Sequence, residues 1–73
     1  MNKSVEIYVS LLGENVDVWR PVLAKKIDNS VYFIIQQEYL HEVETWQFEP
    51  GDVVQCKIVQ SSEGPILAAV CKA

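Results

Sequence analysis

His41 and the glutamates around it are the residues of this chain whose side chains could bind a metal ion or move a proton. A histidine beside carboxylates is the minimum set of groups for metal coordination or for general acid–base catalysis. Glu38, Glu42 and Glu44 follow no metal-binding spacing around it, however. On an extended chain Glu42 and Glu44 also point to the face opposite the histidine. We expect a solvated loop here, with no metal and no cofactor; a small-ligand or metal-binding barrel is the alternative.

Cys56 and Cys71 are the other candidate reactive groups. They lie in separate apolar segments and lack the paired spacing of a zinc site or of a redox motif. We expect both to be buried, reduced thiols that act as small hydrophobic groups. Folding the chain as a symmetric hairpin about Glu63-Gly64 would place them opposite each other, so a cross-strand disulfide is the alternative.

No catalytic residue is predicted. The chain has one histidine and no glycine-rich loop that could hold a phosphate group, because Gly13, Gly51 and Gly64 are isolated. Nothing in the sequence places a serine or cysteine beside a base that would activate it. A chain of 73 residues is also shorter than most scaffolds that hold a substrate pocket and its supporting residues. We therefore expect a protein that is not an enzyme.

Two aromatic signatures are stronger candidates for binding: Trp-Arg-Pro-Val at 19–22 and Trp-x-Phe-x-Pro-Gly-Asp at 46–52. Tryptophan and arginine are enriched at the hot spots of protein interfaces. In a small domain burial is scarce, however, and this favours tryptophans as core anchors over exposed ones. We take the hypothetical binding residues from both signatures and from the acidic stretch around the second: Trp19, Arg20, Glu44, Trp46 and Glu49.

Five acidic residues lie in the segment from 38 to 52, which contains no lysine or arginine. Charge runs commonly keep a surface solvated, and this is the interpretation we favour. The functional alternative is an electrostatic docking surface for a basic partner. Asp52 has a separate structural role available, because a carboxylate after Pro50-Gly51 can accept N–H groups of the turn.

The composition is that of a globular protein, with a net charge of −4. Its six lysines and arginines are spread along the chain, so it lacks the basic stripe that nucleic-acid binding needs, and we expect no nucleic-acid partner. Glu6 interrupts the N-terminal apolar stretch that resembles a signal peptide, and no apolar run is long enough to span a membrane. We expect a cytoplasmic protein in which a homodimer or a protein partner would add buried area.

Alternating apolar residues predict short strands along most of the chain. Val5, Ile7 and Val9 share one face of the first strand. Pro21 lacks a ladder donor and predicts an edge or a bulge in the second strand. The segment 38–45 is expected to be a loop with at most one helical turn. The expected strands are Val5–Leu12, Val18–Ile27, Val31–Gln37, Trp46–Phe48, Val53–Val59 and Ile66–Lys72.

Five or six short strands with strong turn signals predict an all-β fold, a single small barrel domain over residues 1–73, because closure hides strand edges. An SH3-like barrel is the first choice and an OB-like barrel the second. The two signatures resemble those of a group of small bacterial proteins of uncharacterised function, which carry similar Trp-Arg-Pro-Val and Trp-x-Phe-x-Pro-Gly-Asp sequences. This resemblance covers nearly the whole chain, implies a stand-alone small β protein, and supplies no catalytic residue.

The leading functional hypothesis is a non-enzymatic interaction module that docks a protein partner through an aromatic and acidic surface formed by the five hypothetical binding residues. An immunity-type or inhibitor protein that masks a basic enzyme is the second hypothesis, because small size and acidity suit that role. A ligand-binding or catalytic barrel built on His41 comes last.

Overall fold

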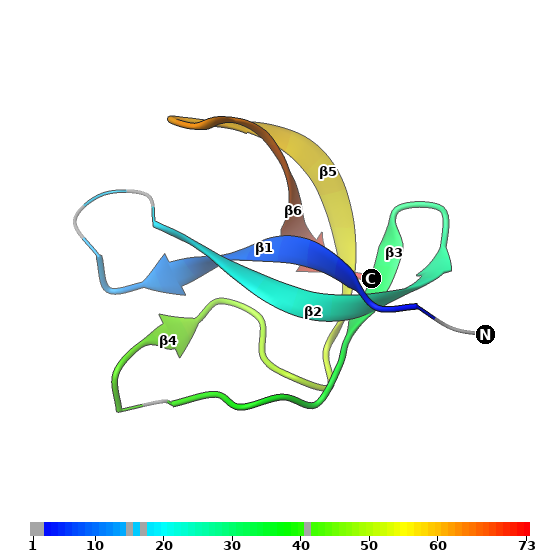
Figure 1. Cartoon of the computed structure of the whole chain (residues 1–73), viewed down its shortest axis with the longest axis horizontal. Helices are drawn as coiled ribbons and strands as arrows, with labels where there is room; N and C mark the ends of the chain where they lie inside the picture. The colour runs from blue at the N-terminus through cyan, green and yellow to red at the C-terminus, as the bar shows by residue number, and fades with distance from the viewer. Residues whose placement is uncertain (1–2, 15, 17, 41) are drawn as a thin grey trace.

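The computed structural model describes residues 3–14, 16, 18–40 and 42–73. These residues form six strands and no helix, which confirms the prediction of an all-β, small-barrel fold (Figure 1). No described segment therefore provides a helix of the length and apolarity that crossing a membrane requires. The strands are β1 Val5–Leu12, β2 Trp19–Asp28, β3 Val31–Ile34, β4 Thr45–Trp46, β5 Val53–Ser61 and β6 Gly64–Lys72.

Five of the strands follow one another around a ring. β1 pairs with β2, β2 with β3, β3 with β5 and β5 with β6, each time antiparallel (Figure 1). Because the direction reverses at each step, the fifth strand of the ring runs parallel to the first, and β6 meets β1 through one parallel pair, Tyr8 with Ala68. β4 pairs with the end of β1. In Figure 1, β4 and the segment that precedes it lie below β1 and β2.

Alternation along the strands places one face of each inside the ring. Ile7 and Val9 are fully buried, as their period-two spacing predicts. Trp46 is also buried and confirms the interpretation of a tryptophan as a core anchor, whereas Trp19 is half-buried outside this cluster, so the same interpretation is wrong for it. The buried cluster contains Ile7, Val9, Val22, Ala24, Tyr32, Ile34, Trp46, Phe48, Val54, Cys56 and Ala69.

The first half of β2 is an edge, as Pro21 predicts. Here β2 pairs with β1 on one side. On the other side the Leu23 N–H donates to the Gln37 side-chain oxygen at 3.0 Å, and Gln37 Nε2 donates to the Leu23 carbonyl at 2.8 Å. Because N–H and C=O groups alternate in direction along a strand, Pro21 faces this open side, where no ladder donor is needed. The Gln37 amide replaces a neighbouring strand, and β3 ends at Ile34 instead of at Gln37 as predicted.

β5 and β6 form a long hairpin whose register shifts between Gln55 and Cys56. The ladder from Ser61–Gly64 to Cys56–Ala69 centres the turn on Ser62-Glu63, one residue earlier than the disulfide alternative needs, and beyond the shift Cys71 lies opposite Gln55. The symmetric register that the disulfide alternative needs is therefore absent from this hairpin, and both thiols are free. Cys56 is buried as predicted. The same prediction is wrong for Cys71, which is exposed because its side chain, like that of Gln55, points away from the core.

The Pro50-Gly51 turn is tied to the end of β3. The Gly51 N–H donates to the Ile34 carbonyl at 2.8 Å, and the Ile34 N–H donates to the Asp52 carbonyl at 2.9 Å. Gly51 has a φ of 96°, a conformation that favours glycine. The Asp52 carboxylate accepts the Glu49 N–H at 2.8 Å, which confirms the structural role predicted for it. This turn brings the acidic segment back onto the barrel.

Candidate functional site

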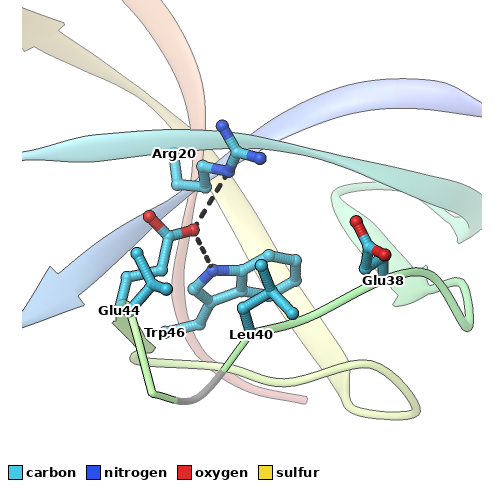
Figure 2. A pocket seen from close by; sticks show the side chains of 6 residues that line it. Arg20, Glu38, Leu40, Glu44 and Trp46 are labelled. Carbon is cyan, nitrogen blue, oxygen red and sulfur yellow. Dashed lines mark hydrogen bonds and ion pairs between the residues drawn. The ribbon is translucent and has the colours of Figure 1, made fainter.

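Three of the five predicted binding residues meet at one place (Figure 2). Arg20 comes from the open edge of β2, Trp46 from β4, and Glu44 directly precedes β4. The chain enters this place through a turn in which the N–H groups of Val43 and Glu44 donate to the Leu40 carbonyl at 3.0 and 3.1 Å. This turn agrees with the predicted loop that holds at most one helical turn.

Glu44 links the arginine to the tryptophan. Its Oε1 accepts the indole N–H of Trp46 at 2.7 Å and lies 3.2 Å from Arg20 Nε. Trp46 is 3% exposed, and an indole N–H that is cut off from water needs such an acceptor. An ionised acceptor makes a shorter and stronger hydrogen bond than a neutral one. Because Arg20 balances the carboxylate, the pair as a whole carries no net charge.

Tyr39 holds the other side of Trp46. Its ring stacks on the indole with centroids 4.4 Å apart, and its hydroxyl oxygen accepts the backbone N–H of Trp46 at 2.8 Å. A stacked aromatic pair contributes about 0.5–1.5 kcal/mol beyond its buried area. Tyr39 is missing from the residues predicted for the site. Its place seven positions before Trp46 gives no local signal that the loop folds back on itself.

A hollow of about 160 Å³ lies over the Trp46 ring. Figure 2 shows Leu40 in front of the indole, Arg20 above it and Glu38 to one side. Leu40 is 56% exposed and Val43 is 75% exposed, so two large apolar side chains stand in solvent at its rim. The volume suits one inserted side chain, since pockets for drug-sized ligands measure about 300–1,000 Å³.

The other two predicted residues lie elsewhere. Trp19 neighbours Arg20 on β2 and points to the opposite face, where it lines a separate hollow with Tyr8. Glu49 is exposed before the Pro50-Gly51 turn and borders a third hollow. The aromatic and acidic residues that the sequence suggests as one surface are therefore divided among three places.

The charge around the hollow over Trp46 is negative. The Arg20–Glu44 pair is balanced, while Glu38 and Glu42 are exposed in a segment without lysine or arginine. Among the residues that the structure describes, no three His, Cys, Asp or Glu side chains are grouped so that they could hold a metal ion. His41, on which the metal-binding alternative depends, lies outside the described residues.

Removing the Glu44 side chain tests the link that it makes. Glu44→Ala leaves the indole N–H of Trp46 without its acceptor and is expected to lower the free energy of unfolding by about 1–2 kcal/mol. Glu44→Gln retains an acceptor oxygen and should lose less than half of that amount. Urea unfolding followed by circular dichroism measures both changes, with Glu42→Ala, an exposed glutamate of the same loop, as the control. Equal losses for Glu44→Ala and Glu42→Ala would show that the indole bond contributes nothing.

The hollow combines an apolar rim, a balanced ion pair and an unbalanced carboxylate, an arrangement suited to an apolar side chain with a positive charge beside it. Apolar and charged side chains that a bound molecule can contact line the hollow: Arg20, Glu38, Leu40, Val43, Glu44 and Trp46. Compared with models of known protein families, with curated proteins and with solved structures, the chain matches none of them.

Proposed function

We propose that this protein is a non-enzymatic interaction module that docks a protein partner at the hollow over Trp46. The observation that carries this proposal is the pair of exposed apolar side chains, Leu40 and Val43, at the rim of a hollow in an acidic loop. The occupant is a segment of another protein that inserts one large apolar side chain and flanks it with lysine or arginine.

The apolar contact comes from the loop and from the floor of the hollow. Leu40 and Val43 belong to a turn that two backbone hydrogen bonds close, so the free protein already presents them together. The Trp46 floor is fixed by the stacked Tyr39 ring and by the hydrogen bond to Glu44. Binding to a surface that is ordered beforehand loses less conformational entropy. An inserted leucine or tryptophan would cover this apolar surface.

The negative charge around the hollow favours partners in which lysine or arginine flanks the inserted residue. Glu38 lines the hollow and Glu42 lies in the same loop, whereas Arg20 is already paired with Glu44 at 3.2 Å. Charges at the rim of an interface steer association and choose between partners more than they add affinity. An acidic segment would be repelled by the same carboxylates, so the site should discriminate between basic and acidic flanks.

A matched pair of peptides tests this proposal. One peptide carries a single tryptophan between lysines, and its counterpart carries glutamates in place of the lysines. We expect the basic peptide to shift the backbone amide resonances of residues 38–46 in an NMR titration, and the acidic peptide to leave them unchanged. High salt should weaken the binding of the basic peptide, because exposed charges are screened.

Leu40→Ser is the decisive variant, because Leu40 is 56% exposed and its loss leaves the core intact. We expect the Kd of the basic peptide to rise about tenfold, because the variant loses the burial of about half of a leucine side chain on binding. Ile27→Ser is the matched control, since Ile27 is 55% exposed near the other end of β2, and it should bind as the wild type does. Equal binding of the two peptides, or an unchanged Kd in Leu40→Ser, would overturn the proposal.

A further inference from the structure

We infer that a second site, on the opposite face of β2, binds the ammonium group of a small organic cation. The site is the hollow of about 210 Å³ between the outer face of β1 and β2 and the tip of the β5–β6 hairpin. In Figure 1 this tip reaches out above β1, on the same side of the molecule as the β1–β2 loop. Tyr8, Trp19, Ser61 and Glu63 line the hollow and carry the argument.

Two aromatic rings form one wall of this hollow. Across the β1–β2 ladder Tyr8 pairs with Pro21, and Ser10 pairs with Trp19, so Tyr8 and Trp19 are diagonal neighbours on one face. Both are half-buried and lie outside the core cluster, which leaves part of each ring accessible. The face of an aromatic ring carries negative potential and attracts an ammonium group within about 6 Å of its centre.

Two carboxylates add negative charge beside the rings. Glu63 lines the hollow from the hairpin tip, and Glu6 lies next to Tyr8, whose hydroxyl donates to Glu6 Oε1 at 3.4 Å. The charge of Glu6, the partial desolvation of the phenol and the charge of Glu63 together raise the pKa of Tyr8. Both carboxylates therefore act on the space next to the ring. No lysine or arginine is among the described residues that line this hollow.

The hairpin tip holds Glu63 in a fixed backbone conformation. The Ser61 hydroxyl donates to the Gly64 carbonyl at 2.7 Å, and the Glu63 N–H donates to Ser61 Oγ at 3.2 Å. Gly64 has a φ of 113°, which completes the tight turn between the strands. The backbone that carries Glu63 is thus ordered at the rim of the hollow before any ligand arrives, which reduces the entropy lost on binding.

This combination favours an organic cation over other ligands. A metal ion needs several converging ligand atoms at about 2.0–2.6 Å, and the faces of two aromatic rings supply none of them. An anion would be repelled by Glu6 and Glu63. A methylated ammonium group needs no fixed ligand geometry, so aromatic faces and a nearby carboxylate are sufficient to hold it. The volume, below the roughly 300 Å³ of a drug-sized pocket, limits the bound part to such a head group.

Choline and its uncharged analogue, in which a tert-butyl group replaces the trimethylammonium group, test the inference because they share a shape and differ in charge. The chain has two tryptophans, so its NMR spectrum has two indole N–H resonances, which Trp19→Phe assigns. We expect choline to shift the Trp19 resonance with a Kd in the millimolar range. The analogue, and sodium chloride at the same concentration, should leave it in place. Trp46, whose indole N–H is bonded to Glu44, is the internal control.

Glu63→Gln is the decisive variant, because it retains the size of the side chain and removes its charge. We expect the Kd of choline to rise about fivefold, the change that losing one exposed charge pair gives. Asp28→Asn removes the same charge from the far end of β2, outside both hollows, and is the matched control, expected to bind choline as the wild type does.

Three results would overturn this inference. An equal shift of Trp19 by choline and by the uncharged analogue would show an apolar contact without recognition of charge. An unchanged Kd in Glu63→Gln would show that the hairpin tip takes no part. A choline-dependent shift confined to the Trp46 resonance would place the cation in the other hollow, where it would support the docking proposal and not this one.

Discussion

Replacing Trp46 with alanine is expected to lower the free energy of unfolding by about 4 kcal/mol, as large-to-small changes of buried aromatic residues do. A native chain of 73 residues has a total of roughly 4–11 kcal/mol, so this one change removes much of its stability. The midpoint of thermal unfolding should fall by about 20 °C. Melting curves followed by circular dichroism measure the shift.

This effect is large because the substitution removes apolar burial, a stacked ring and a hydrogen bond at the same time. The side chain is 3% exposed, stacks on Tyr39 at 4.4 Å and donates its indole N–H to Glu44 at 2.7 Å. Trp19→Ala is the control, because that tryptophan is half-buried outside the core cluster and should lose less than half as much stability. Equal losses for the two tryptophans would contradict the assignment of Trp46 as the anchor.

Alkylation at pH 8 is expected to distinguish the two cysteines by about a hundredfold in rate. Burial raises the pKa of the Cys56 thiol from its ordinary 9.0 to about 11. This lowers the ionised fraction of the thiol at pH 8 about a hundredfold, and the thiolate is the form that reacts. Cys71 is exposed on β6. A pulse of iodoacetamide followed by peptide mapping gives both rates, and urea-unfolded protein supplies the reference in which the rates should converge. Similar rates in the folded protein would show that Cys56 is accessible.

The same burial sets the direction of a pH effect on stability. The pKa of Cys56 is raised in the folded state from its ordinary 9.0 to about 11, so the unfolded chain loses this proton first as the pH rises. The contribution of the neutral thiol is therefore complete below pH 9 and is lost as the pH approaches 11. Cys56→Ala should remove this part of the decline. The difference in urea midpoint between wild type and variant should then be smaller at about pH 10 than at about pH 8.

The parts of the fold that depend on local chemistry could be predicted from the sequence. The alternation of Ile7 and Val9 with polar neighbours gives β1 its bounds and its buried face. Pro21 marks an edge because it has no N–H to donate. Asp52 accepts a turn N–H because it directly follows the Pro50-Gly51 turn. Each of these outcomes is decided within a few residues of the signal.

The parts that depend on distant partners could not be predicted in this way. β3 is shorter than its apolar run because the Gln37 side-chain amide makes hydrogen bonds to the backbone of Leu23, which lies fourteen residues earlier in the chain. The register shift between Gln55 and Cys56 leaves no mark in the sequence, and it turns Cys71 away from the core. The site itself depends on Tyr39 folding back onto Trp46 and on Arg20 and Trp19 pointing to opposite faces of β2.

The closure of the ring through Tyr8 and Ala68 bears on the order in which the chain is expected to fold. The β1–β2, β2–β3 and β5–β6 pairs join neighbours along the chain, but the closing pair joins residues 60 positions apart, from 8 to 68. The entropy lost on closing a loop grows with this separation, and long-range contacts slow folding. We therefore expect the hairpins to form early and the ring to close late. The speed of folding is then expected to depend on the closure of a ladder that registers one residue pair.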